Sequence, residues 1–502
     1  MKTGWEKLIT AARTVESERA GAPSWLQTCI EYNAATEYGR AYGFKNICDV
    51  DDYRTRVPLT VYEDLKPFIE KILAGTADVL FAGSPIAFEK TGGSGGGEKI
   101  IPYSRESLRD FRNALLPWIA SLAGIYGLGS GRAYLAVSPA LRTAQNSPSG
   151  VPLGLPDSAY LGKDATAAIS ELSVVSQDTA ALTCFDEWQL ATLYELLRAP
   201  DLEMISVWSP TFMSSLMEGV HLRKPELLKI FREGGTIGGR GAPSDNPARR
   251  RLESYGGGDA SVLWPDLKLV SCWTDGSSAP YVAALSKRFP HAAMQGKGLL
   301  LTEGVVTVPD IFGRPLLALG SGFYEFLDED GNSRLCHELK EGETYEVIMT
   351  TSGGLYRYRA GDSVRCTGYA ESTPVLRFAG RCGVFSDLTG EKLSDAFVLD
   401  CLIRAECEGM LIPRSLPEPG YLLLTEEKCG DDKLMRLEAA LRRNPQYAYA
   451  REMRQLRPLS FRRIENLAKR YADCAFSQGR RLGDVKIPAL CTDSEWMKEA
   501  QG

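Results

Sequence analysis

The sequence has few of the histidines, and lacks the paired cysteines, on which many hydrolytic, redox and zinc sites depend. Its 502 residues include three histidines, and none of its twelve cysteines forms a C-x-x-C pair. This pattern disfavours a zinc ribbon or a thiol redox motif. The N-terminal residues also lack the apolar run of a signal peptide. We therefore expect reduced thiols and a cytoplasmic location.

The chain also lacks a strong excess of charge of one sign. Its net charge is −6, and no basic stripe stands out, so we expect no nucleic-acid partner. The uncharged stretch 113–131 is long enough to raise the question of a membrane span, but it contains Pro117 and four glycines. A buried helix followed by a loop suits it better, and we expect no membrane partner.

The periodicity of the apolar residues predicts an α/β fold with mostly parallel sheets. A chain of this length exceeds one ordinary core, so two or more domains are expected. Between residues 104 and 303, helical and buried-strand patterns alternate, which is typical of parallel α/β domains. The predicted helices are 108–122, 186–198 and 211–220, and the predicted strands are 133–137, 204–208, 267–272 and 298–301.

The pattern changes after about residue 310. Half-exposed strands at 323–327 and 344–351, with Asp330-Gly331 as a hairpin signal, predict a small antiparallel β subdomain at about 310–376. We assign residues 1–376 to a large N-terminal domain and 377–502 to a smaller α+β domain. Its predicted elements are a strand at 421–424 and helices at 433–443 and 445–456. The glycine- and proline-rich segments 145–162 and 234–258 fit either lids or surface connections.

A glycine-rich run, TGGSGGGEK, extends from Thr91 to Lys99. It fits neither the P-loop nor the dinucleotide fingerprint. It contains G-x-S-x-G, but that motif requires a following helix, whereas Ile100 to Tyr103 read as extended chain. With only three histidines available, a serine hydrolase is disfavoured. Contact with phosphate is favoured, and a plain flexible loop is the alternative.

Two carboxylates follow apolar or aromatic runs further along the chain, and each is predicted to lie at the end of a strand. Glu303 lies in LLLTEG, and Asp362 ends the run GLYRYRAGD. Each could contact a ribose or a metal ion. The structural alternatives are a strand-end carboxylate for Glu303 and a turn in which Asp362 bonds its own backbone.

The order and spacing of these runs resemble the acyl-acid amido synthetases of the Gretchen Hagen (auxin-responsive) family, within the acyl-adenylating superfamily. The segment Thr350 to Asp362 matches that family's T-T-x-x-G-L-Y-R-Y-R-x-G-D closely. Residues 91–98 followed by Ile101-Pro102-Tyr103 match its glycine-rich loop, and residues 302–304 match its T-E-G. Residues 377–393 resemble the interdomain segment, and 486–488 the segment that carries a lysine to the active site. Departures are Gly95 in place of a hydroxyl residue, Leu299 in place of a tyrosine, and Gly383 at a hinge position that is commonly polar.

The resemblance implies a two-step ligation that uses ATP and Mg²⁺. The acid would attack the α-phosphate to give an acyl-adenylate and pyrophosphate, and an amine, expected to be an amino acid, would then displace AMP. The implied nucleotide-binding residues are Thr91, Gly92, Gly93, Ser94, Gly95, Gly96, Gly97, Thr302, Glu303, Asp362 and Arg381. Glu303 would also hold Mg²⁺, and Asp362 would accept from the ribose. Lys486 would act on the α-phosphate, and the smaller domain would rotate about residues 380–383.

Three points stay open at the level of sequence. Trp208, Phe212 and Trp273 are candidates for the acid pocket, but ordinary core aromatics fit equally well. The acyl acceptor could be coenzyme A or another thiol instead of an amine, and a nucleotide-binding module without chemistry is a third hypothesis. The acid, the amine and the oligomeric state are not specified by the sequence.

Overall fold

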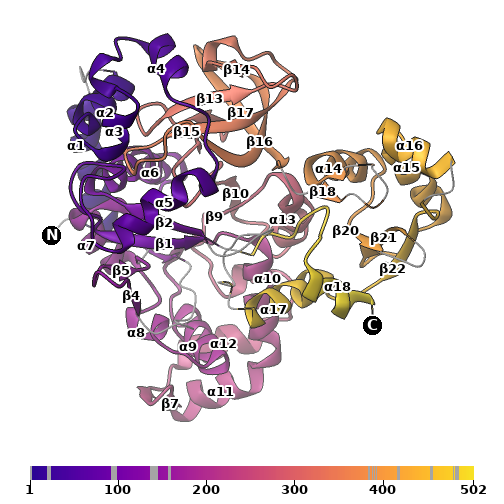
Figure 1. The fold of residues 1–502 in the computed structure, drawn as a ribbon. Helices are drawn as coiled ribbons and strands as arrows, with labels where there is room; N and C mark the ends of the chain where they lie inside the picture. The colour runs from indigo at the N-terminus through magenta and orange to yellow at the C-terminus, as the bar shows by residue number, and fades with distance from the viewer. Residues whose placement is uncertain are drawn as a thin grey trace.

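The computed structural model shows a large N-terminal body and a smaller C-terminal lobe (Figure 1). The structure describes residues 3–19, 24–91, 99–135, 145–155, 160–382, 385–386, 388, 391, 393–414, 419–452, 456–478, 480 and 485–501. The strands of the body form two four-stranded sheets, a seven-stranded sheet and a short hairpin, and the lobe has sheets of its own.

A four-stranded, fully parallel sheet lies at the centre of the body, in the order β10-β9-β6-β3. Its strands are β3 (Arg132–Leu135), β6 (Leu202–Ser206), β9 (Leu269–Cys272) and β10 (Ala293–Gly296). Neighbouring side chains point to opposite faces. Met204 and Leu269 therefore pack in one core, whereas Ile205 and Val270 pack in another.

Helices cover both faces of this sheet. One core includes residues of α1 (Gly4–Arg19), α6 (Arg105–Tyr126) and α7 (Lys163–Leu172). The other core includes residues of α9 (Phe185–Leu197), α10 (Pro210–Leu222), α11 (Lys224–Glu233), α12 (Asn246–Ser254) and α13 (Ala279–Ser286). The predicted α/β architecture is therefore confirmed, and the helices predicted at 108–122, 186–198 and 211–220 are present.

The N-terminal helices pack against a mixed sheet and share its core with the antiparallel sheet described next. The mixed sheet has the order β2-β1-β5-β4, with β1 (Ala87–Thr91), β2 (Lys99–Tyr103), β4 (Gln145–Asn146) and β5 (Pro152–Leu153). The helices are α2 (Trp25–Asn33), α3 (Glu37–Ala41), α4 (Val50–Arg56) and α5 (Tyr62–Leu73).

The seven-stranded sheet is antiparallel and has the order β11-β12-β17-β16-β15-β13-β14. Its strands are β11 (Thr307–Pro309), β12 (Pro315–Leu317), β13 (Phe323–Leu327), β14 (Ser333–Arg334), β15 (Thr344–Thr350), β16 (Tyr358–Ala370) and β17 (Thr373–Arg381). The predicted Asp330-Gly331 turn joins β13 to β14, with Gly331 at φ 80°. The domain ranges stay predictions, and β17 carries the chain across residue 377 without a break.

The C-terminal lobe has two cores made of its own residues. Its strands are β18 (Phe385–Ser386), β19 (Leu393–Ser394), β20 (Met410–Arg414), β21 (Gly420–Thr425) and β22 (Ser460–Arg463). Its helices are α14 (Asp395–Arg404), α15 (Asp431–Leu441), α16 (Pro445–Glu452), α17 (Leu467–Ser477) and α18 (Ser494–Gln501). The strand and helices predicted here are present.

Two details of the sequence interpretation are wrong. No strand forms at 298–301, where Leu300 makes one isolated bridge to Val305, and the strand is β10 just before it. Asp362 lies within β16 instead of ending a strand. The segment 234–258 contains the hairpin of β7 (Gly235–Ile237) and β8 (Arg240–Ala242) as well as α12, and 145–162 contains β4 and β5.

All twelve cysteines are free thiols. In the described parts of the chain, each helix is too short or too polar to cross a bilayer.

Candidate active site

A buried acid and an arginine face each other on neighbouring strands of the antiparallel sheet. Asp362 on β16 and Arg381 on β17 are register partners, and Arg381 Nε lies 3.5 Å from Asp362 Oδ1. Asp362 is 3% exposed, and its Oδ1 has no hydrogen-bond partner. A buried carboxylate oxygen without a donor is costly, so this atom is suited to accept from a bound hydroxyl.

Glu303 lies on a tight turn beside this pair. The turn is closed by backbone hydrogen bonds between Leu301 and Gly304, and the Tyr103 hydroxyl donates to the Thr302 carbonyl at 2.5 Å. Burial raises the pKa of the Glu303 carboxyl, the nearby Asp362 charge raises it further, and Lys99 and Arg381 oppose the shift. Glu303, Asp362 and Arg381 therefore meet in one place.

The glycine-rich run is anchored beside the same place. Thr91 at the end of β1 pairs with Lys99 at the start of β2, so the two ends of the run lie side by side. Lys99 Nζ lies 3.3 Å from the Tyr358 hydroxyl and 5.7 Å from the Tyr62 ring centroid. The glycines at 92, 93, 95, 96 and 97 and Ser94 lie outside the described residues, as does the Thr91 side chain. Lys99 and Tyr358 were not predicted as site residues, although both lie in the runs that carried the prediction.

Lys486 reaches the body from the C-terminal lobe. Its Nζ lies 4.6 Å from the Trp273 ring centroid and 5.1 Å from that of Phe378. Trp273 directly follows β9 of the parallel sheet, and Phe378 lies on β17 of the antiparallel sheet. An ion pair of 2.8 Å between Arg377 and Asp275 joins the same two regions. Lys486 therefore lies where both sheets and the lobe meet.

Aromatic side chains lie at the carboxyl edge of the parallel sheet, which is the edge where such sheets bind ligands. Trp208 follows β6 and Trp273 follows β9, with ring centroids 5.9 Å apart. Phe212 is 2% exposed and packs in the helical core, 6.0 Å from the Trp188 ring centroid. Its position is that of a core aromatic.

The segment predicted as a hinge lies against the lobe. Gly380 has φ 139°, and a Cβ added there would lie 2.6 Å from the Ala396 Cα of α14. Asp395, the first residue of α14, accepts from the Leu490 backbone at 2.8 Å. A side chain at position 380 would collide with α14, so the close approach of this helix to the backbone requires glycine there. Gly383 lies outside the described residues.

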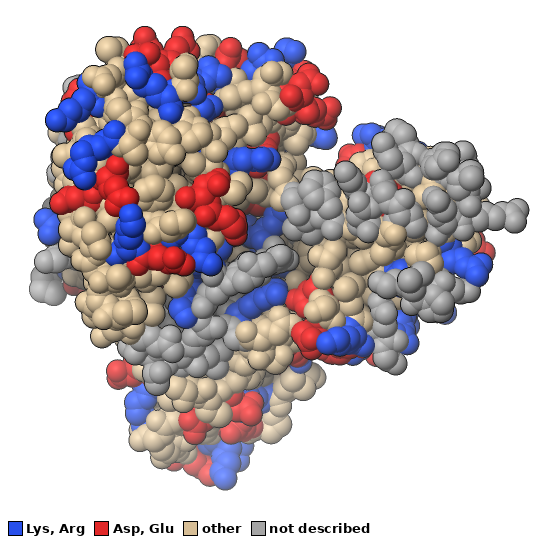
Figure 2. Space-filling model, in the orientation of Figure 1, with Lys and Arg blue, Asp and Glu red and all other residues tan. Residues whose placement is uncertain are grey.

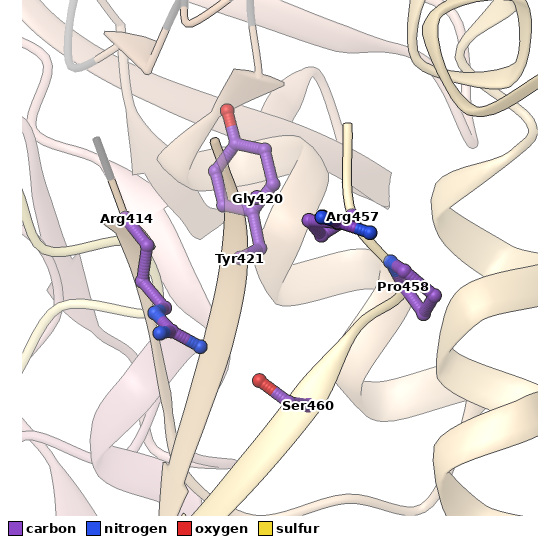
Figure 3. Close-up of a pocket in the computed structure, with 6 residues that line it drawn as sticks. All are labelled: Arg414, Gly420, Tyr421, Arg457, Pro458 and Ser460. Atoms are coloured by element: carbon purple, nitrogen blue, oxygen red, sulfur yellow. The ribbon is translucent and has the colours of Figure 1, made fainter. Parts of the chain in front are cut away.

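The surface between body and lobe is hollowed, and lysine and arginine side chains lie along part of this hollow (Figure 2). A separate cavity of about 240 Å³ lies within the lobe (Figure 3). Its lining residues are Arg414, Gly420, Tyr421, Arg457, Pro458 and Ser460. None of the predicted site residues that the structure describes lines that cavity. The charged groups and the rings at the junction of the sheets are therefore the better candidate for the active site.

A parallel α/β body, an antiparallel sheet and a small lobe whose Lys486 lies between them are the parts that the resemblance to an acyl-adenylating enzyme led us to expect. The GH3 family N-terminal domain matches residues 18–294, and the GH3 family central domain matches residues 316–381. The chain belongs to the GH3 family, the Gretchen Hagen family of the sequence resemblance.

Individual relatives agree with this assignment. The indole-3-acetic acid-amido synthetase GH3.3 of Arabidopsis thaliana is 23% identical over 92% of this chain and 88% of its own length. The structure of AtGH3.15 acyl acid amido synthetase in complex with 2,4-DB has a TM-score of 0.81 at 18% identity, covering 99% of this chain and 94% of that one. A 2-hydroxyisobutyryl-CoA ligase shares the fold with a TM-score of 0.50 at 14% identity, covering 95% of this chain and 90% of that one.

Proposed function

We propose that the protein is an ATP-dependent ligase that adenylates a carboxylic acid and transfers the acyl group to an amino acid. The products are an amide, AMP and pyrophosphate. Membership of a family of amido synthetases supports the reaction class. The observation that carries the proposal is the position of Lys486 against Trp273 and Phe378, because it joins the acid-facing and nucleotide-facing parts of one site.

The nucleotide lies across the antiparallel sheet in this proposal. Asp362 Oδ1 accepts from a ribose hydroxyl, which supplies the donor that this buried atom lacks. The residues Gly92 to Gly97, with Ser94, contact the β- and γ-phosphates through backbone amides and one hydroxyl. Lys99, held over Tyr62 and Tyr358 at the end of that run, adds positive charge beside them.

Glu303 is the residue that would hold Mg²⁺. Its surroundings raise the pKa of its carboxyl and so disfavour the charged form, which a divalent cation favours. Among the described residues no three potential His, Cys, Asp or Glu ligands cluster, which suits an ion that keeps water and phosphate oxygens as ligands. Bound Mg²⁺ supplies charge neutralisation at the phosphates.

The protein contributes position and charge to both steps and needs no covalent nucleophile. Lys486 donates to the negative charge that develops at the α-phosphate as the carboxylate attacks. The lobe then turns about residues 380–383, at the end of β17, to admit the amine. The twelve free cysteines suit a reducing compartment, so we place the reaction in the cytoplasm.

Acid-dependent release of pyrophosphate tests this function. Pools of carboxylic acids are incubated with the protein, ATP and Mg²⁺, each with a mixture of amino acids or with coenzyme A. The proposal requires release with at least one pool and an N-acyl amino acid detected by mass spectrometry. Detection of an acyl thioester without an amide would show that the acyl acceptor is a thiol instead of an amino acid. If no acid caused release of pyrophosphate, the proposed reaction would be rejected.

A further inference from the structure

A lysine that the sequence interpretation did not single out lies deep at the acid-facing end of the site. Lys297 directly follows β10 and is 5% exposed. Its Nζ donates to Ser206 Oγ at 2.6 Å and lies 5.2 Å from the Trp208 ring centroid and 5.7 Å from that of Trp118. The ammonium of Lys297 therefore places a positive charge and hydrogen-bond donors at the buried end of the site.

The backbone at Lys297 is fixed by two glycines. A Cβ at Gly296 would lie 2.4 Å from Thr274 Oγ1, and one at Gly298 would lie 2.4 Å from the Thr307 carbonyl oxygen. Gly298 also has φ 76°, a conformation that disfavours other residues. The close approach of the Thr307 backbone at Gly298 leaves the chain beside Lys297 little room to move, which suits recognition of a ligand group.

Buried polar atoms without partners lie next to this lysine. Ser206, Ser271 and Gln295 are register neighbours on β6, β9 and β10, so their side chains share one face of the sheet. Met204, Leu269 and Ala293, two residues earlier on the same strands, pack in the core that contains Trp118 of α6. The three polar side chains therefore face α6.

Ser271 is 0% exposed and Gln295 is 3% exposed. Ser271 Oγ, Gln295 Oε1 and Trp118 Nε1 have no hydrogen-bond partner. Unsatisfied buried polar atoms are rare in folded proteins and call for an explanation such as a ligand. The donors around Lys297, namely its ammonium, a hydroxyl and an indole N–H, suit a group with several acceptor lone pairs, such as a carboxylate.

The position of Lys297 relative to Lys486 indicates whether Lys297 would bind the reacting carboxylate of the acid or a second anionic group. Under the proposed function, on which this inference rests, the reacting carboxylate lies beside Lys486. Lys486 packs on Trp273, Trp273 lies against Trp208, and Lys297 packs on Trp208. Two indole rings therefore separate the lysines, so Lys297 meets a part of the acid remote from its reacting end.

We propose that Lys297, with Ser271 and Trp118, forms a subsite for a second anionic group of the acyl acid. The substrate class is an aromatic acid with a carboxylate or another anion at its far end. Flat rings at Trp118, Trp208 and Trp273 suit an aromatic body between the two charges.

Matched pairs of acids test this subsite. The pairs are benzoate with benzene-1,4-dicarboxylate, cinnamate with 4-carboxycinnamate, and 2-naphthoate with naphthalene-2,6-dicarboxylate. The wild type should favour the dianionic member of at least one pair by about tenfold or more in kcat/KM, because a hydrogen bond to a buried charge is worth that much. Lys297→Met should lose this preference, because its kcat/KM should fall much more with the dianionic member of the pair than with the monoacid. Lys297→Arg should keep part of it, and the exposed Lys340→Met is the control.

The outcomes separate this inference from the proposed function. No preference for a dianion in the wild type, or an equal loss with both members of a pair in Lys297→Met, overturns the subsite while the ligase reaction stands. If no acid releases pyrophosphate, the reaction is rejected, and calorimetric titration of the three dicarboxylates without nucleotide tests the subsite by itself. Binding to the wild type that Lys297→Met abolishes supports it, and no binding overturns it.

Discussion

The two ends of the proposed site are built from different kinds of structure. The nucleotide-facing end uses charged residues, Asp362 and Arg381 on adjacent antiparallel strands and Glu303 on a turn. The acid-facing end uses rings and a lysine that follow three parallel strands, Trp208, Trp273 and Lys297. In the proposed function, the first end holds the nucleotide, which every reaction of such a ligase shares. The second end faces the acid, which differs from one ligase to another.

The largest effect is expected at Lys486, which lies between the two ends. Lys486→Ala removes the ammonium that we propose acts on the α-phosphate, and it should slow pyrophosphate release by about a hundredfold or more. The fold should be retained, as circular dichroism would show. Lys498, exposed and paired with Glu495, offers a control as Lys498→Ala. Turnover at the wild-type rate would remove Lys486 from the mechanism.

The next largest effect is expected at the nucleotide-facing end alone. Asp362→Ala removes the acceptor proposed for the ribose, and the apparent affinity for ATP should fall by about tenfold or more. The KM of the acid should stay close to the wild-type value. Asp330→Ala, on the exposed β13–β14 turn, is the matched control. An unchanged ATP affinity would refute the ribose role.

A change at the acid-facing end should affect the KM of the acid and leave the affinity for ATP unchanged. Trp208→Ala removes a ring that contacts both Trp273 and the ammonium of Lys297. The KM of the acid should rise by roughly two- to tenfold, the range that aromatic contacts contribute, with the ATP affinity unchanged. Steady-state kinetics with each substrate varied in turn would show it. A rise in the KM of ATP alone would contradict the division into two ends.

The smallest effect concerns stability. Burial raises the pKa of Glu303 above its ordinary value, so the folded protein holds this proton more tightly than the unfolded chain does. The folded state is therefore destabilised as the pH rises from the ordinary pKa of a glutamate to the raised pKa of Glu303 in the folded protein. Glu303→Gln removes this cost, and its Tm without nucleotide should exceed that of the wild type by a few degrees at neutral pH. The difference should vanish below about pH 4, where the carboxyl is protonated in both states. A lower Tm at neutral pH would contradict this account of Glu303.

The same contrast explains what the sequence could predict. Asp362 lies in a contiguous run whose spacing is characteristic of its family, so the run was recognisable without a structure. Trp208 and Trp273 were candidates only because they lie at the end of a predicted apolar strand or directly after one. Lys297 was missed because a lysine between two glycines matches no motif. The residues around Lys297 come from different strands, and two of these strands, β6 and β9, are more than sixty residues apart in the sequence.

The error at 298–301 has a physical cause. The apolar residues before Thr302 read as a buried strand. At Gly298, however, the Thr307 carbonyl lies where a Cβ would be, and the chain turns back within the next few residues. Such a close approach between distant residues leaves no mark in the local hydrophobic pattern.

The fate of the oxygen atoms of the acid tests the central claim most directly. An acid with ¹⁸O in both carboxylate oxygens is incubated with the protein, ATP, Mg²⁺ and an amino acid, and the products are analysed by mass spectrometry. Attack on the α-phosphate predicts one ¹⁸O in AMP and one in the amide carbonyl. Label in inorganic phosphate with formation of ADP would show attack at the γ-phosphate and would contradict the account.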